Sequence, residues 1–218
     1  VIVSLCVDHD NVLWIGTFFG GLNRFDGRQF TRYVHSDGDS SSLANDNVWQ
    51  IFEDREQNLW IGTLGGGLDI FNRETNRFKH IQYKGNPPDI GPFNYISCIL
   101  QDKKGNVWVG TTGGIAVFEK GNTTTVFYQS SKDKSDLSNN NVSCLFEDSK
   151  GRIWVGTREG LNLFNEQAKQ FQTFTTSDGL PDDMILNILE DNHQTLWIST
   201  PNGLCNAIPK QGKAGIVF

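Results

Sequence analysis

The segment Leu59-Trp60-Ile61-Gly62-Thr63 decides the fold, because close copies of it recur along the whole chain. The copies are Leu13–Thr17, Val107–Thr111, Ile153–Thr157 and Leu196–Thr200, the last with Ser199 in place of the glycine. Their tryptophans, at positions 14, 60, 108, 154 and 197, are separated by 43 to 48 residues. This is the period of a propeller blade or of a helical-repeat unit. We therefore divide the chain into repeats of about 1–46, 47–94, 95–140, 141–183 and 184–218.

The second repeat shows what each unit contains. Short apolar or alternating runs are separated by polar or glycine-containing links, and the runs are Val48–Phe52, Leu59–Leu64, Leu68–Phe71 and Arg77–Tyr83. Such runs, with hairpin-length links, predict four antiparallel strands. The apolar residues lack the 3.6 periodicity of a helical solenoid, and a β-helix needs a shorter period. The sequence thus predicts an all-β fold, a β-propeller of four-stranded antiparallel blades with five repeats in this chain.

Several positions recur at a constant distance from the tryptophan. An aspartate six residues earlier is expected to open a tight turn, with its carboxylate accepting backbone N–H groups; these are Asp8, Asp54, Asp102, Asp148 and Asp191. Gly105 and Gly151 follow three residues after their aspartates, where such a turn requires positive φ. A glycine six residues after each tryptophan is expected to reverse the chain before the third strand: Gly20, Gly66, Gly114, Gly160 and Gly203. The tryptophans themselves are interpreted as wedges between blades.

Composition excludes some classes of partner. The net charge of the 218 residues is −6, and acidic and basic residues are interspersed, which argues against a nucleic-acid or anionic-membrane surface. No apolar run approaches the roughly 20 residues of a membrane span, so no membrane insertion by this region is expected. The four cysteines lack metal-ligand spacing and are interpreted as buried small hydrophobes, with a disulfide as the alternative. The four histidines share no spacing, so no metal and no cofactor are expected.

The chain opens inside a strand-like run, Val1–Val7, and we interpret it as excised from something longer. The first repeat already contains four predicted strands, so no spare strand is left to close a ring with the last repeat. We expect the apolar faces of the end blades to be lined by Ile2, Leu5, Trp197 and Ile198. Because soluble proteins rarely expose such faces, the chain is expected either to form a homodimer through them or to be part of a larger ring.

Two stretches carry a resemblance to a known family: NDNVWQIFEDREQNLWIGTLGGGLDIFN, residues 45–72, and NNNVSCLFEDSKGRIWVGTREGLNLFN, residues 139–165. They resemble the two-component regulator propeller repeats of Bacteroides-type hybrid two-component systems. The resemblance implies periplasmic seven-bladed propellers that recognise glycan breakdown products or pass such signals inward, in proteins that also carry histidine kinase activity. This chain departs from that pattern in having five repeats and no membrane span, kinase or DNA-binding region.

Recognition is expected where the repeats differ, because variable loops on a constant scaffold carry specificity. In a propeller, the links between second and third strands and the links between blades open on one face. The blade-to-blade links are Val34–Asp46, Lys84–Asn94, Gln129–Asn140 and Thr175–Asp183. Aromatic residues near this face are expected to stack on sugar rings, namely Phe18, Phe19, Trp49 and Tyr95. Polar residues of the shorter links are expected to bind hydroxyl groups or a uronic carboxylate, namely Arg158, Glu159 and Asn202.

Alternatives remain open at this stage. The aromatic residues are also compatible with packing under the long links or against a partner domain of the same sensor. An enzyme similar to streptogramin lyases would need histidines and carboxylates that converge near the channel mouth, and only His35 lies in a link between blades. The third interpretation is a structural dimerisation spacer without its own ligand. The pattern favours a non-catalytic sensor propeller with an oligosaccharide ligand.

Overall fold

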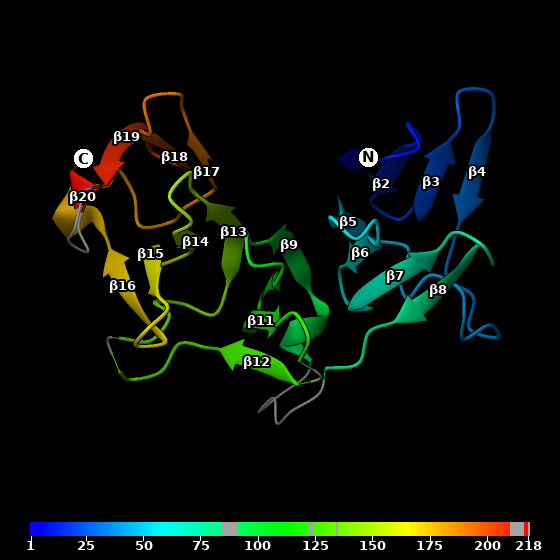
Figure 1. The fold of residues 1–218 in the computed structure, drawn as a ribbon, viewed down its shortest axis with the longest axis horizontal. Coiled ribbons are helices and arrows are strands. Elements are labelled where there is room, and N and C mark those ends of the chain that lie inside the picture. Colours follow the sequence, from blue (N-terminus) through cyan, green and yellow to red (C-terminus); the bar gives the residue numbers. More distant parts are fainter. Residues whose placement is uncertain (84–90, 123, 134, 210–215, 218) are drawn as a thin grey trace.

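The computed structural model describes residues 1–83, 91–122, 124–133, 135–209 and 216–217, which form five four-stranded sheets in an open arc (Figure 1). Each sheet is antiparallel and its strands follow one another in chain order. The first blade, in blue, and the fifth, in orange and red, lie at the two ends of the arc (Figure 1). The predicted all-β architecture of propeller blades is confirmed.

In each blade the first strand lies on the inner side of the arc and the fourth strand on the outer side (Figure 1). Blade 1 consists of β1 (Ile2–Val7), β2 (Leu13–Thr17), β3 (Leu22–Phe25) and β4 (Phe30–Tyr33). Blade 2 consists of β5 (Val48–Glu53), β6 (Leu59–Thr63), β7 (Leu68–Asn72) and β8 (Arg77–His80). Blade 3 consists of β9 (Ile96–Gln101), β10 (Val107–Thr111), β11 (Gly114–Phe118) and β12 (Thr125–Tyr128). Blade 4 consists of β13 (Val142–Glu147), β14 (Ile153–Thr157), β15 (Gly160–Asn165) and β16 (Gln170–Phe174). Blade 5 consists of β17 (Asn187–Glu190), β18 (Leu196–Thr200), β19 (Gly203–Pro209) and β20 (Ile216–Val217).

The turn between the first two strands is built in the same way in every blade. In blade 3, Asp102 Oδ1 accepts the backbone N–H groups of Lys104 and Asn106, both at 2.9 Å. Its Oδ2 accepts the indole N–H of Trp108 at 2.9 Å. The same indole-to-carboxylate bond, at 2.8 to 3.0 Å, links the other four tryptophans to their aspartates. The recurring aspartates thus form the predicted turns, and they also orient the tryptophans, a role that the sequence pattern alone did not indicate.

Positive φ is required at the third residue after each of these aspartates, whatever the residue type. Gly105 and Gly151 adopt φ of 88° and 79°, as predicted. The other three blades place non-glycine residues there, Asn11 at 59°, Gln57 at 65° and Gln194 at 64°. The turn therefore imposes a left-handed conformation that costs side-chain-bearing residues conformational energy.

The glycine before the third strand differs from the prediction in two blades. The glycines with positive φ are Gly21 and Gly67 rather than Gly20 and Gly66, because blades 1 and 2 have one more residue in this link. In blades 3 to 5 the predicted Gly114, Gly160 and Gly203 do adopt positive φ. At Gly21 a Cβ atom would lie 2.1 Å from the carbonyl oxygen of Tyr33, so the close approach of the fourth strand also excludes a side chain.

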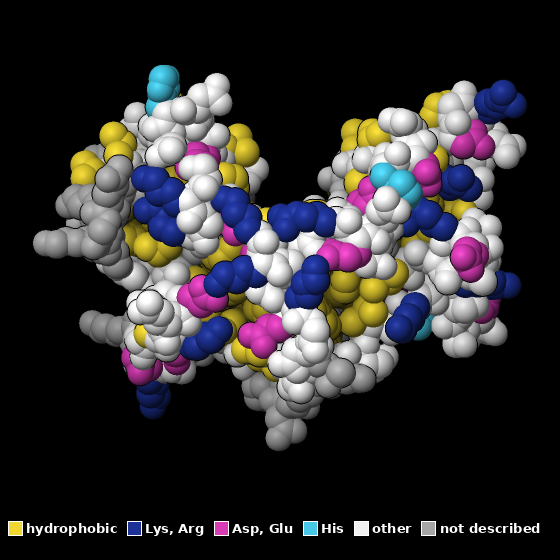
Figure 2. Space-filling model, in the orientation of Figure 1, with side chains coloured by type: hydrophobic (Ala, Val, Ile, Leu, Met, Phe, Trp, Pro, Cys, Tyr) yellow, Lys and Arg dark blue, Asp and Glu magenta, His cyan; other side chains and the backbone are white. Residues whose placement is uncertain are grey.

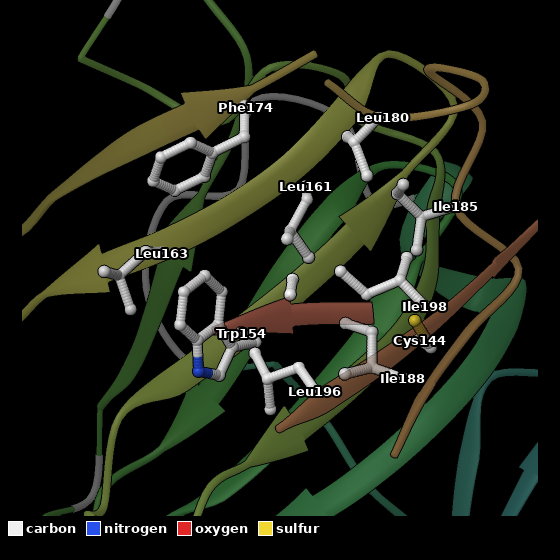
Figure 3. Close-up of a cluster of buried hydrophobic side chains, with 11 residues drawn as sticks. Cys144, Trp154, Leu161, Leu163, Phe174, Leu180, Ile185, Ile188, Leu196 and Ile198 are labelled. Atoms are coloured by element: carbon white, nitrogen blue, oxygen red, sulfur yellow. The ribbon is translucent and has the colours of Figure 1, made fainter. Parts of the chain in front are cut away.

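The tryptophans pack between neighbouring blades. The ring centroid of Trp14 lies 4.9 Å from that of Phe71 in blade 2, and that of Trp108 lies 5.1 Å from that of Phe164 in blade 4. Trp154 is fully buried, and Figure 3 shows it beside Leu163 of its own blade and Leu196 of blade 5. This confirms the expected wedge. Trp197, at the end of the arc, is 38% exposed.

A repeated hydrogen bond ties each inner turn to the next blade. The backbone N–H of His9 donates to Glu53 Oε2 at 2.8 Å, and that of Lys103 donates to Glu147 Oε2 at 2.9 Å. Arg55 and Ser149 make the corresponding bonds to Gln101 and Glu190. The acceptor stands seven residues before each tryptophan, where blade 1 has the exposed Val7 instead. Each interface of the arc is therefore held by a carboxylate or amide supplied by the following blade.

The end faces are apolar, with one difference from the prediction. Leu5 is 62% exposed, whereas its counterparts Ile51 and Ile99 are buried against a preceding blade. Ile2 is 61% exposed, and Trp197 is partly exposed as expected. Ile198, however, is fully buried, because the alternation of β18 turns it away from the open end and towards blade 4.

Two further expectations can be compared with the structure. No helix in the described part of the chain is long and apolar enough to cross a membrane. All four cysteines are free thiols, so the disulfide alternative is wrong for this structure. Only Cys144 is buried, whereas Cys6, Cys98 and Cys205 are partly exposed, so the expectation of four buried cysteines is correct for Cys144 alone. Burial raises the pKa of Cys98 to about 12 and that of Cys144 to about 11.

Candidate functional site

The candidate residues lie on one face of the arc, which we call the strand-start face. It is formed by the residues that precede the inner strands, such as Asn47 and Tyr95, and by the links between second and third strands. Backbone hydrogen bonds hold these parts together, from Leu64 N to Asn47 O at 3.0 Å and from Gly65 N to Asn94 O at 2.9 Å. The second bond joins blade 2 to the start of blade 3, so neighbouring blades form a continuous surface.

Phe18 and Phe19 form an exposed aromatic pair on this face. Their ring centroids lie 4.1 Å apart at an interplanar angle of 57°, and Phe19 is 70% exposed. Phe19 has φ of 63°, a conformation that bulky residues rarely adopt, and its counterpart in blade 2 is Gly65 at 103°. The bond from Phe19 N to Asn47 Oδ1 at 2.9 Å stabilises this backbone. Blade 1 therefore maintains an unfavourable conformation while it displays an aromatic side chain to solvent.

The other two aromatic candidates lie in the adjoining blades. Trp49 is 39% exposed and Tyr95 is 48% exposed. The ring of Tyr95 lies over Gly65, where an added Cβ atom would be 3.8 Å from Tyr95 Cζ. The absence of a side chain at Gly65 leaves the tyrosine ring accessible. Blades 1, 2 and 3 thus each present aromatic surface on the strand-start face.

The polar candidates lie in blades 4 and 5. Arg158 and Glu159 are adjacent and exposed, and the N–H of Glu159 donates to Thr157 Oγ1 at 3.2 Å. Asn202 Nδ2 donates to Asp182 Oδ2 at 2.8 Å, which leaves the amide oxygen of Asn202 available. Among the described residues, no hydrogen bond or ring contact joins these side chains to the aromatic candidates. The candidates therefore form an aromatic group and a polar group rather than one cluster.

The links between blades are anchored more firmly than their polar sequences suggest. Leu43, Leu137 and Leu180 occupy the same position in three of these links, and all three are buried. Of the link Lys84–Asn94, residues 84–90 lie outside the described part of the chain, as does Lys134 in the link Gln129–Asn140. The recurrence of a leucine a few residues before the next inner strand was the signal that could have revealed this anchoring.

A family model for the two-component regulator propeller matches five segments of the chain, which together cover more than half of it: residues 1–19, 42–65, 90–113, 136–159 and 179–202. The chain belongs to the two-component regulator propeller family. No curated protein matches this regulator propeller in a sequence search.

Solved structures resemble this regulator propeller in fold. An extracellular domain from B. thetaiotaomicron, assigned to a hybrid two component system, is 25% identical with a TM-score of 0.76 over 94% of this chain. The chain spans only 27% of that protein's length. Virginiamycin B lyase from Staphylococcus aureus is 13% identical with a TM-score of 0.66, over 98% of this chain and 71% of the lyase. At that identity the likeness to the lyase concerns the fold alone.

A buried carboxylate lies behind the strand-start face, paired with a histidine. Asp69 in β7 is fully buried and accepts the N–H of Ala44 at 2.8 Å, which anchors the link between blades 1 and 2. Its other oxygen lies 2.6 Å from Nδ1 of His80. Blade 4 performs the same task with neutral groups, since Asn162 accepts the N–H of Ser138 at 3.0 Å and the hydroxyl of Thr173 at 3.1 Å. Burial raises the pKa of Asp69, although the bond from His80 opposes this.

Replacing the pair with its neutral counterpart, Asp69→Asn with His80→Thr, is expected to be neutral or stabilising by up to about 2 kcal/mol. Because the folded pKa of Asp69 lies above its unfolded value, ionisation opposes folding as the pH rises between the two values. The wild type should therefore lose stability relative to the variant across that window, as measured by urea unfolding from about pH 3.5 upwards. A variant that is strongly destabilised at every pH would show that the charged pair contributes more than its neutral replacement.

In residues 1–83, 91–122, 124–133, 135–209 and 216–217, no group of three or more His, Cys, Asp or Glu side chains is placed to hold a metal ion. The recurring aspartates are occupied by turn N–H groups and indoles. The strand-start face can therefore supply stacking surfaces, hydrogen bonds and the charges of Arg158 and Glu159.

Proposed function

We propose that this chain is part of the extracytoplasmic sensor region of a hybrid two-component signalling protein, and that its strand-start face binds an oligosaccharide without catalysing a reaction. Membership of the two-component regulator propeller family supports the signalling role. The similar extracellular domain from B. thetaiotaomicron supports a position outside the cytoplasm, and the location that we propose is the periplasm. Signal output, including histidine kinase activity, would then belong to other domains of the whole protein.

The observation that carries the binding proposal is the conformation of Phe19. An exposed phenylalanine with φ of 63° gains little from burial, and glycine serves at the equivalent position of blade 2. A phenylalanine at this position is accounted for if its ring contacts a ligand. Exposed aromatic faces suit sugar rings, since the apolar C–H groups of a sugar pack on an aromatic face while its hydroxyl groups remain hydrogen-bonded to water or to polar side chains.

Phe19→Gly is the sharpest test, because glycine adopts positive φ readily. We expect the variant to fold as well as the wild type and to bind its oligosaccharide at least tenfold more weakly, which is about 1.4 kcal/mol. Ligands would be found by screening the 218-residue chain against an array of oligosaccharides from digested plant and animal polysaccharides. Affinities would then be measured by isothermal titration calorimetry.

Phe30→Ala is the matched control, because Phe30 is an exposed aromatic residue, 65% exposed, on the outer strand β4. It should leave binding unchanged. Binding that survives Phe19→Gly at full strength would refute the assignment of the site. A wild-type chain that binds no oligosaccharide of the array would refute the proposed ligand class.

A further inference from the structure

A second binding site is suggested by a cleft between blades 3 and 4. It lies where the inner turns 102–106 and 148–152 are, at the opposite ends of the strands from the strand-start face. The cleft has a volume of about 420 Å³, within the range of small-molecule sites. Aromatic rings line it, with the centroids of Trp108 and Tyr128 6.0 Å apart and almost parallel, and that of Phe164 5.1 Å from Trp108.

The equivalent cleft between blades 1 and 2 is nearly closed, with a volume of about 100 Å³. Two arginines fill it. The guanidinium of Arg24 lies 5.9 Å from the ring centroid of Trp14, and Arg73 Nη2 reaches Asp8 Oδ2 at 3.4 Å. In blade 1, Arg24 on the third strand pairs with Trp14 on the second. In blade 3 the residue that pairs with the tryptophan in the same way is Val117. Arg73 corresponds to Glu166, which forms an ion pair with Lys104 at the rim. The open cleft thus results from two replacements of large side chains.

A second change leaves a polar group unused in the cleft. In blade 1 the hydroxyl of Tyr33 donates to Asn76 Oδ1 at 3.1 Å. Its counterpart in blade 3 is Tyr128, and the residue corresponding to Asn76 is Lys169, which shares its left-handed φ. Within the described residues the hydroxyl of Tyr128 has no hydrogen-bond partner. Burial raises the pKa of Tyr128 to about 12, so this hydroxyl stays protonated and can donate.

The charges around the cleft favour an anion. Of its lysines, Lys150 and Lys169 have no carboxylate partner among the described residues, and Lys169 Nζ lies 5.9 Å from the ring centroid of Phe164. Basic residues outnumber acidic ones in the lining, with Lys103, Lys104, Lys150, Arg152 and Lys169 against Asp102, Glu119, Glu147 and Glu166. Glu166 pairs with Lys104, while Glu147 and Glu119 accept N–H groups of Lys103 and Asn122. Figure 2 shows Lys and Arg side chains across the middle of the arc, where Figure 1 places β9 and β13.

We propose that this cleft binds a compact ring-shaped molecule that bears one carboxylate. The ring lies against the aromatic lining, the carboxylate pairs with Lys150 and Lys169, and the hydroxyl of Tyr128 donates a hydrogen bond to the ligand. Both a uronic acid and an aromatic acid have this chemistry. The site is independent of the proposed oligosaccharide site, because it lies on the other side of the blades and uses none of its residues.

The probes are D-galacturonate and benzoate, each with its neutral methyl ester. Binding to the 218-residue chain would be followed by NMR through the indole N–H signal of Trp108, identified by its loss in Trp108→Phe. We expect one acid to shift this signal in a saturable manner and its ester to bind at least tenfold more weakly. The acid that binds shows whether the cleft accepts a uronic acid or an aromatic acid.

Lys150→Gln with Lys169→Asn is expected to weaken binding of that acid at least tenfold. Asparagine is chosen at 169 because Asn76 already occupies the equivalent position in blade 2 with a similar φ. Lys79→Gln, which removes an exposed lysine of β8, is the control and should have no effect. Glu166→Arg would restore one of the two arginines that close the equivalent cleft between blades 1 and 2, and its side chain is expected to occupy part of the ligand volume and weaken binding.

Three results would overturn the proposal: no saturable shift with either acid, equal binding of acid and ester, or unchanged binding after the two lysine substitutions. Glu166→Arg places a large cation in the interface, so that variant is interpreted only if its thermal unfolding matches the wild type. The lysine variant alters surface positions and decides the outcome if the arginine variant does not fold.

Discussion

Trp154→Ala is expected to lower the free energy of unfolding by about 3–5 kcal/mol, the range for truncating a large buried aromatic side chain. Trp154 is fully buried and packs against blade 5 as well as its own blade. Its indole N–H donates to Asp148 Oδ2 at 2.9 Å, so truncation also leaves a buried carboxylate with one donor fewer. Urea unfolding followed by far-UV circular dichroism measures the effect.

Trp197→Ala is the matched control, because the same residue with the same hydrogen bond stands at the open end of the arc and is 38% exposed. Its loss should cost about 1 kcal/mol, near the average for point substitutions. Equal losses at the two positions would contradict the conclusion that burial between blades, rather than the hydrogen bond to aspartate, is the source of the stabilisation.

Asp148→Ala is expected to have a comparable effect, about 3–5 kcal/mol, the cost of removing one partner of a buried ion pair. The carboxylate is fully buried and accepts the N–H groups of Lys150 and Arg152 at 3.0 and 2.9 Å, as well as Arg152 Nε at 2.6 Å. Together with Trp154 Nε1, four donors would lose their acceptor. A turn aspartate that bonded only to backbone, the role predicted from the sequence, would cost about 0.5–2 kcal/mol on the scale of helix caps.

Asp191→Ala controls for the turn itself. Asp191 accepts the N–H groups of His193 and Thr195 and the indole of Trp197 in the same geometry, but it is more open to solvent at the end of the arc. Water can replace those bonds, so the loss of stability should be clearly smaller than at Asp148. If Asp148→Ala cost no more than Asp191→Ala, the buried network would not be the cause of the stabilisation.

Some features of the site follow from sequence because they depend on strand direction. The links between second and third strands and the starts of the inner strands must lie at the same end of an antiparallel blade. The order of the strands therefore suffices to assign Phe18, Phe19, Trp49 and Tyr95 to one face. Whether they meet the polar candidates depends on how blades are spaced around the arc, and periodicity carries no information on that.

Other features could not be predicted because they depend on contacts between repeats. The bond from Asp69 to the link before its own blade joins residues 25 positions apart, and no local pattern in the sequence indicates it. The burial of Ile198 depended on which side of β18 faces blade 4. The shift from Gly66 to Gly67 could have been found in sequence, since the leucine of the third strand stands one residue later in blades 1 and 2.

The sequence by itself determined the blade: its period, its four strands, the aspartate turn and the tryptophan wedge. These features depend on residues close together in the sequence, and they recur in every repeat, so a pattern inferred from one repeat can be tested on the others. Only the tertiary structure decided which surfaces are open. The cleft between blades 3 and 4 exists because Val117 and Glu166 stand where Arg24 and Arg73 fill the equivalent space. Arg24 and Arg73 belong to different blades and lie 49 residues apart, so their shared task appears only when two blades pack together.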